Sequence, residues 1–180
     1  SGMVHYNAVS GLFDNLDTSN SPLKSNQIKI LKLSSRGEIL VGGSFLYIFK
    51  PDSKVWSTIP VEGQSIDKIF EDSKGILWVT SGNFGVHKID PSTGFNKHFD
   101  LTPENNKYLS DRERPYFFED SKHNFWICVH GGGLALFQPE SNSFRFFRND
   151  HSDPKSISSN TVMCMAEDHT GTLWVGTSLQ

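Results

Sequence analysis

Short apolar or alternating runs, separated by polar turns, recur along this chain and predict β-strands. Residues 65–99 contain one complete unit, with strands expected at 66–71, 76–80, 86–90 and 95–99. The turns between them carry Asp72, Gly75, Pro91 and Gly94, which are residue types that favour tight turns and end strands. Four short antiparallel strands on tight turns are typical of one blade of a β-propeller.

The unit repeats along the chain. The phrase FEDSKGILWVT at 70–80 returns as FEDSKHNFWICV at 118–129 and AEDHTGTLWVGT at 166–177, with a divergent copy, LSSRGEILVGG, at 33–43. We take Gly37, Gly75, Asn124 and Gly171 as the tight-turn residues, which gives spacings of 38, 49 and 47 residues. A strand-forming repeat of this period indicates a propeller.

The two ends of the chain read as incomplete units. Residues 3–16 align with 86–99 through Gly11 and Gly94, so they correspond to third and fourth strands. The last copy supplies only first and second strands. The sequence therefore predicts an all-β fold of four-stranded antiparallel propeller blades, three full blades and two complementary half blades. The expected boundaries are a half blade at 3–16, blades at about 28–60, 66–100 and 114–148, and a half blade at 162–177.

Two half blades leave unpaired strand edges, which favour association. They can pair within one chain to close a ring of four blades, or between two chains to give about eight, and both numbers lie within the usual range. We favour pairing between chains, because a ring of four is strained for the twist of such sheets. Self-association through the half-blade edges is therefore expected.

Composition excludes several classes of protein. The 180 residues are 36% hydrophobic with a formal net charge of −3, so no basic field recruits nucleic acid or anionic lipid. No apolar run approaches the roughly 18 residues of a membrane helix, and no signal peptide is visible. Ser1-Gly2-Met3 resembles a cloning remnant and residues 178–180 stop within a repeat. We expect a fragment whose membrane anchor lies elsewhere in its parent.

The repeated phrase resembles the regulator-propeller repeat of hybrid two-component sensors from Bacteroides-type gut bacteria. The resemblance rests on a run of shared positions: Glu71-Asp72, Gly75, Leu77-Trp78-Val79, Glu119-Asp120, Trp126, Gly132-Gly133-Leu134, Glu167-Asp168, Gly171, Leu173-Trp174-Val175-Gly176-Thr177 and the polar linker 149–160. The first copy departs from it, with Leu33-Ser34 in place of Glu-Asp and Leu40 in place of Trp.

The resemblance implies an extracytoplasmic, periplasmic sensor. Such proteins carry two propellers, an immunoglobulin-like stalk and one membrane helix, followed inside by a histidine kinase, a receiver and a DNA-binding domain. The outer part is thought to bind oligosaccharides and to induce polysaccharide-utilisation genes. The fragment itself would sense without catalysis or a cofactor, and would meet the membrane only through the anchor of its parent.

Recurrence favours structural roles for the shared polar and aromatic residues. Trp78, Trp126 and Trp174 occupy one repeat position, which predicts core packing between blades rather than sugar stacking. Asp72, Asp120 and Asp168 are expected to cap turns rather than act as acid–base catalysts. The neighbouring Glu71, Glu119 and Glu167 recur in the same way, which again favours structure.

Function is expected where the repeats differ, in the loops at one face. The positions before the first strands hold Asn26, Gln64, Arg112 and Asn160, a polar series suited to a channel mouth. A sugar site needs flat aromatic surface and planar donors. The candidate ligand-binding residues are Arg112, Arg114, Tyr116, Asn83, Phe84, His130 and Tyr108. The alternative is that they are solvated loop residues, with Arg114 paired to Glu113 or Asp111.

Other chemistry has little support in the sequence. The seven His residues are dispersed, so no metal site is expected. Cys128 and Cys164 lie in strands of different repeats, and we expect two buried free thiols. No catalytic residue is identified, and no G-x-S-x-G motif occurs. Two alternatives stay open: a propeller lyase that uses a channel His, and a structural or protein-interaction segment whose ligand is held by other blades.

Overall fold

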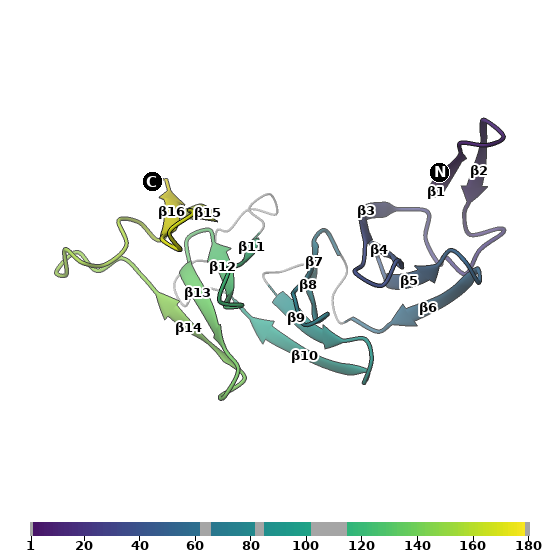
Figure 1. The fold of residues 1–180 in the computed structure, drawn as a ribbon. Helices are drawn as coiled ribbons and strands as arrows, with labels where there is room; N and C mark the ends of the chain where they lie inside the picture. The colour runs from purple at the N-terminus through teal and green to yellow at the C-terminus, as the bar shows by residue number, and fades with distance from the viewer. Residues whose placement is uncertain (1, 62–65, 82–84, 102–114, 179–180) are drawn as a thin grey trace. The chain divides into compact units, whose positions relative to one another are not determined.

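The computed structural model describes residues 2–61, 66–81, 85–101 and 115–178 (Figure 1). All regular structure in these residues is β-strand, in antiparallel sheets of consecutive strands. The all-β, four-stranded architecture predicted from the repeat is confirmed. No helix in the described part of the chain is long and apolar enough to cross a membrane.

The strands form five sheets. The first, which we call the N-terminal half-blade, contains β1 (Met3–Asn7) and β2 (Leu12–Leu16). Blade 1 contains β3 (Ile28–Leu33), β4 (Ile39–Gly43), β5 (Leu46–Lys50) and β6 (Val55–Ile59). Blade 2 contains β7 (Ile69–Glu71), β8 (Leu77–Ser81), β9 (Gly85–Asp90) and β10 (Phe95–Asp100). Blade 3 contains β11 (Tyr116–Glu119), β12 (Phe125–Val129), β13 (Gly133–Gln138) and β14 (Ser143–Phe147). The C-terminal half-blade contains β15 (Val162–Glu167) and β16 (Leu173–Thr177).

The chain divides into two compact units, one built mostly from residues up to His98 and the other mostly from Phe99 onward. Within the first unit, one apolar cluster contains Leu40 of blade 1 and Val79 of blade 2, and another contains Met3 and Val41. Each of these clusters draws its side chains from two consecutive sheets. Burial between neighbouring sheets, rather than within one, is what a propeller requires.

The second unit has its own apolar cluster, contributed by blade 3 and the C-terminal half-blade. It contains Cys128, Leu134, Val162 and Met165. Cys128 is buried, but Cys164 is exposed, and neither forms a disulfide. The expectation of two buried thiols is therefore wrong for Cys164. This residue lies on a two-stranded sheet, which leaves more of its surface open than a four-stranded blade does.

Strand β7 begins at Ile69, three residues later than the predicted strand at 66–71. The hydroxyl of Thr80 explains the difference, because it accepts a hydrogen bond from the amide of Lys68 at 3.0 Å. The amide of Ile66 instead donates to the carbonyl of Gly43 in blade 1 at 2.7 Å. The chain entering blade 2 is therefore tied to a side chain and to the preceding blade before regular pairing starts.

The tight-turn residue of blade 3 is His123, not Asn124 as predicted. His123 has φ 62°, close to Gly75 at 76° and Gly171 at 80°. The amide of Asn124 donates to Asp120 Oδ1 at 2.9 Å, as the amide of Thr172 does to Asp168. With His123 in register the spacings become 38, 48 and 48 residues. His occupies a backbone conformation that usually favours glycine.

The turn between third and fourth strands is also marked by positive φ. It contains Gly11, Lys54, Gly94 and Asn142, with φ of 70°, 55°, 76° and 46°. The residues thus occupy one repeat position. Because Gly11 shares the position, β1 and β2 correspond to third and fourth strands, as the alignment through Gly94 predicts.

Candidate ligand-binding site

Tyr116 and His130 lie at the same end of blade 3. Tyr116 is the first residue of β11 and pairs with Cys128 of β12, so it lies next to the end of that strand. His130 follows β12 directly, in the turn that leads to β13. The Tyr116 side chain is 39% exposed and His130 is half-buried. An aromatic ring and an imidazole thus lie at this end of blade 3, where the loops begin.

Glycine fixes the turn after His130. Gly131 and Gly133 have φ of 70° and 88°, and the amide of Gly133 donates to the carbonyl of Asn160 at 2.9 Å. A Cβ at Gly133 would lie 2.3 Å from the carbonyl oxygen of Phe147. Only glycine permits this approach, so the turn is held closely against β14 and the linker that follows it.

The polar linker 149–160 is organised by its own side chains. Asn160 Oδ1 accepts from the amide of Asn149 at 2.7 Å, and Asn149 Nδ2 donates to the carbonyl of Ile157 at 2.7 Å. Asn26 acts in the same way before β3, where its Oδ1 accepts from the amide of Thr18 at 2.9 Å. Asn26 and Asn160, two of the polar residues that precede first strands, therefore stabilise the linkers before those strands. This is a structural role.

The remaining predicted site residues lie outside the described residues: Arg112, Arg114, Tyr108, Asn83 and Phe84, together with Gln64 of the polar series. The structure therefore places two members of the candidate set, Tyr116 and His130, at one end of one blade. The grouping of the other five with them stays a prediction.

The recurring aspartates cap turns, as expected. Asp120 Oδ1 accepts from the amides of Lys122 and Asn124 at 3.0 and 2.9 Å, and its Oδ2 accepts from Trp126 Nε1 at 2.9 Å. Burial raises the pKa of Asp120, but hydrogen bonds from Trp126 and Asn124 outweigh it and the net pKa is lowered. A carboxyl group held ionised in this way is unsuited to general-acid catalysis.

Asp168 repeats the arrangement in the C-terminal half-blade. Its Oδ1 accepts from the hydroxyl and the amide of Thr170 at 2.6 and 2.9 Å, and its Oδ2 accepts from Trp174 Nε1 at 2.7 Å. These bonds, led by the Thr170 hydroxyl, hold the pKa of Asp168 far below its usual value. The Asp–Trp pair six residues apart is thus one structural device, used in both of these copies.

The tryptophans differ in burial. Trp78 is 1% exposed and belongs to the core, whereas Trp174 is 63% exposed. Trp126 is half-buried, and its ring centroid lies 6.0 Å from that of Phe147 on β14. The core prediction is therefore wrong for Trp174. The two-stranded sheet that carries it has no third or fourth strand to cover the indole.

The glutamates beside these aspartates join consecutive repeats, a role the sequence reasoning did not assign. Glu71 accepts from the amide and hydroxyl of Ser35 at 2.7 and 2.6 Å. Glu119 does the same with Ser73 at 2.8 and 2.6 Å, and Glu167 with Ser121 at 2.6 and 2.6 Å. We call each pair a Ser–Glu clamp. The sequence signal was the serine at one turn position in three copies.

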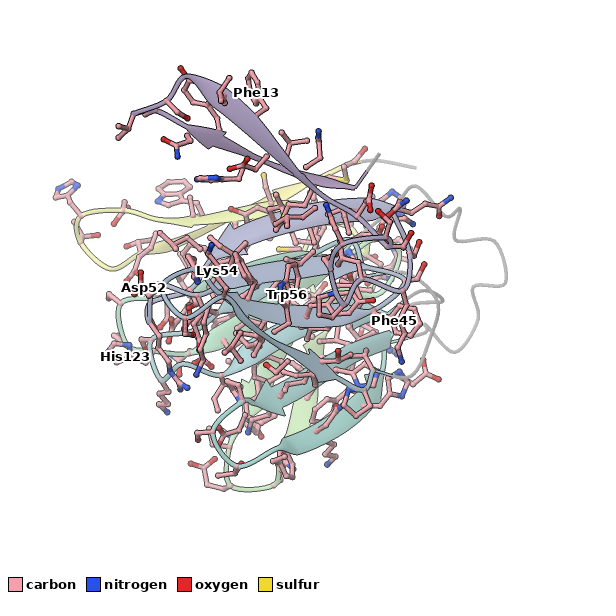
Figure 2. The ribbon with its side chains drawn as sticks, turned by 90° about the vertical axis from the view of Figure 1, so that its right-hand side faces the viewer. Phe13, Phe45, Asp52, Lys54, Trp56 and His123 are labelled. Atoms are coloured by element: carbon pink, nitrogen blue, oxygen red, sulfur yellow. The ribbon has the colours of Figure 1, made fainter. Side chains whose placement is uncertain are left out.

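No group of three or more His, Cys, Asp or Glu side chains that could hold a metal ion occurs in the described ranges. His123 Nδ1 lies 2.8 Å from Ser73 Oγ, but that hydroxyl donates to Glu119 within a clamp. Figure 2 shows His123 at the periphery of the fold. The Ser73 hydroxyl and the Glu119 carboxylate thus form one of the contacts that join consecutive repeats.

Consecutive antiparallel sheets, joined by clamps and packed through apolar clusters within each unit, define a β-propeller repeat protein. Comparison with known families narrows this class, because residues 156–178 match the family described as Two component regulator propeller. The match covers the end of the polar linker and the C-terminal half-blade, part of the segment that carries the resemblance seen in the sequence. A comparison with curated proteins gives no match.

Solved structures share the fold over nearly the whole chain. The extracellular domain of the hybrid two component system BT4673 from B. thetaiotaomicron matches with a TM-score of 0.68 and 18% identity, over 98% of this chain and 24% of that one. The corresponding domain of BT3049 from the same organism matches with a TM-score of 0.66 and 19% identity, over 98% and 22%. This chain thus spans about a quarter of their length.

A virginiamycin B lyase from Staphylococcus aureus also has this fold. It matches with a TM-score of 0.60 and 14% identity, over 93% of this chain and 53% of the lyase. At these identities the likeness concerns the fold alone. The fold therefore occurs both in sensor ectodomains and in an enzyme, and the choice between them depends on the site.

Proposed function

We propose that this chain is part of the periplasmic sensor of a hybrid two-component system, whose parent protein is a histidine kinase. The observation that carries the proposal is the regulator-propeller match at residues 156–178. The fold match to the extracellular domains of two-component systems, which covers 98% of this chain, supports it. The shared aspartates and glutamates serve turns and clamps, which favours a binding role over catalysis.

The ligand we propose is an oligosaccharide, and its binding would induce polysaccharide-utilisation genes through the parent protein. Tyr116 has a partly exposed ring, and His130 places a half-buried imidazole at the same end of blade 3. Sugars present apolar ring faces and many hydroxyls, which these two groups suit. Arg112, Arg114, Tyr108, Asn83 and Phe84 are the further contacts we predict.

Titration of the chain with purified oligosaccharides, followed by calorimetry, tests the proposal. Plant and host glycan fragments serve as probes. We expect Tyr116→Ala and His130→Ala to weaken binding by roughly tenfold or more, as central contacts do. Phe95→Ala is the matched control, because Phe95 is an exposed aromatic on the outer strand β10. Unchanged affinity in both site variants would move the ligand away from blade 3.

A lyase is the second candidate function, and the fold match to the staphylococcal enzyme is the observation that favours it. The two hypotheses differ in turnover. A sensor returns its oligosaccharide unchanged after prolonged incubation, whereas a lyase yields a product with a new double bond that absorbs in the ultraviolet. If no oligosaccharide binds or reacts, a structural or protein-interaction role for these blades becomes the better proposal.

A further inference from the structure

Two histidines of blade 2 lie side by side, although they belong to different strands. His87 is on β9 and His98 is on β10, which are neighbours in the sheet (Figure 1). Their ring centroids are 4.8 Å apart, and the angle between the ring planes is 46°. His87 is 2% exposed, whereas His98 is an exposed residue. The pair therefore reaches from the interior of blade 2 to its surface.

The Asn96 side chain decides which nitrogen of His87 carries a proton. Asn96 Nδ2 lies 2.6 Å from the carbonyl oxygen of Pro60. A carbonyl oxygen only accepts, so the amino end of the Asn96 amide faces Pro60 and the oxygen end faces away from it. That oxygen, Oδ1, lies 2.8 Å from His87 Nδ1. Because an amide oxygen also only accepts, Nδ1 of His87 carries a hydrogen and donates it to Asn96.

A neutral His87 therefore has its lone pair on Nε2. This is a tautomer in which a histidine binds a metal ion, through the nitrogen that carries no hydrogen. Histidines that bind metals almost always donate their other ring N–H to an oxygen atom, which holds the ring in position and makes the binding nitrogen more basic. Asn96 supplies this oxygen, and its own position is set by the bond to Pro60.

The lysines of β9 and β10 are not directed at the imidazole pair, where they would repel a cation. Lys88 follows His87 on β9, and its ammonium nitrogen lies 5.9 Å from the ring centroid of Trp78 on β8. Lys97 lies between Asn96 and His98 on β10. Successive side chains of a strand point to opposite faces of the sheet. Asn96 and His98 therefore share one face of β10, and Lys97 lies on the other.

His5 on β1 is the strongest rival as a metal ligand. Its Nδ1 lies 3.5 Å from Asp14 Oδ2, and the two side chains are 63% and 68% exposed. Two exposed side chains lose rotamer freedom when they are fixed around an ion. His87 is already buried and hydrogen-bonded, so less of this cost remains at the pair on blade 2.

We propose that His87 and His98 bind one divalent transition-metal ion, with water completing its coordination. Imidazole nitrogen suits Zn²⁺, Cu²⁺ and Ni²⁺. Because Asn96 also holds Pro60, the residue after β6, the ion stabilises the β9–β10 hairpin where it contacts the end of blade 1. The inference goes beyond oligosaccharide sensing and does not depend on it.

Calorimetric titration of a Cys164→Ser chain with Zn²⁺ or Cu²⁺ salts tests the proposal. The substitution removes the exposed native thiol, which is itself a ligand for these ions. We expect saturable binding of one ion per chain. His98→Ala should abolish this binding, because it removes one of the two ligands. Asn96→Ala should weaken it by roughly tenfold or more, as the loss of a residue that orients a metal ligand does.

His5→Ala is the matched control, because it removes an exposed imidazole that lies beside a carboxylate. We expect it to leave the affinity for the ion unchanged. Binding that survives His98→Ala, or that is lost in His5→Ala, would overturn the proposal. So would a chain that binds neither ion.

NMR of the Cys164→Ser chain with its histidines intact locates the ion without changing either proposed ligand. Substoichiometric Cu²⁺ is paramagnetic and broadens the signals of the groups nearest to it. We expect the ring signals of His87 and His98 to broaden together, before those of His5 and His123. Broadening that begins at another histidine contradicts the site on blade 2.

Discussion

Glu167 holds Ser121 of the preceding repeat by two hydrogen bonds, with both the amide nitrogen and the hydroxyl oxygen of Ser121 2.6 Å from a carboxylate oxygen. The same two-atom contact joins Ser73 to Glu119 and Ser35 to Glu71. Each contact spans 36 or 46 residues of sequence. The motif phrase thus encodes the attachment of each repeat to the one before it, as well as a strand and a turn.

The clamp predicts energetic coupling between its two residues. Ser121→Ala removes the hydroxyl donor, and Glu167→Gln removes the charge that accepts it. We expect each variant to lower the free energy of unfolding by roughly 1 kcal/mol, and the double variant to lose less than the sum. Urea unfolding followed by circular dichroism measures the coupling. Ser141→Ala is the control, because Ser141 Oγ contacts only Ser143 Oγ at 2.8 Å among the hydrogen bonds described for it. Strict additivity would contradict the clamp.

The Asp120 cap predicts a marked effect of an isosteric change. In Asp120→Asn one oxygen becomes an NH₂ group, which would face the donors Trp126 Nε1 and Asn124 Nδ2. We expect a loss of roughly 1–3 kcal/mol in unfolding free energy, because these donors lose their acceptor. Asp153→Asn is the control, since the exposed Asp153 accepts from the amide of Lys155 and an asparagine oxygen can do the same. Equal losses in the two variants would show that the tryptophan bond has no special weight.

Gly133, in the turn after His130, is predicted to tolerate alanine less well than Gly94, in the turn before β10. Gly133 and Gly94 both have positive φ, at 88° and 76°. An added Cβ meets a carbonyl oxygen at 2.3 Å in Gly133 but nothing within 4 Å in Gly94. We expect Gly94→Ala to cost roughly 1 kcal/mol and Gly133→Ala roughly 3 kcal/mol or more. Thermal or urea unfolding compares them, and a Gly94→Ala loss as large as that of Gly133→Ala would be inconsistent with the close approach.

Asp90, in the turn after β9, is predicted to make the stability of the fold depend on pH in the acid range. Hydrogen bonds from the Ser92 hydroxyl, first, and from the Ser92 amide lower the pKa of Asp90 from 3.8 to about 2. Because the folded pKa is below the unfolded value, the stabilisation is fully present above 3.8 and is lost as the pH falls through about 2. Carboxyl chemical shifts in NMR follow the titration. Ser92→Ala should move the midpoint of Asp90 upward, and an unchanged midpoint would refute the assigned cause.

Much of the fold was predictable because it depends on local patterns that recur. Strands such as Val55–Ile59 combine apolar periodicity with flanking turn residues, and their type follows from these features. The aspartate caps were predictable too, since an aspartate bonds amides two to four residues away. The shift from Asn124 to His123 shows the limit of this reading. The sequence analysis placed the positive φ at Asn124. In the structure Asp120 accepts hydrogen bonds from the amide of Asn124 and from Trp126 Nε1, and the residue with the positive φ is His123.

The sequence alone determined the class of fold and the recurring positions of Trp78, Trp126 and Trp174. Only the tertiary structure decided which of these side chains are buried, because burial depends on strands contributed from elsewhere. Trp78 and Trp174 share one motif position yet are 1% and 63% exposed. The structure also revealed the link from Glu167 to Ser121, since no local pattern reports which turn lies beside a given glutamate.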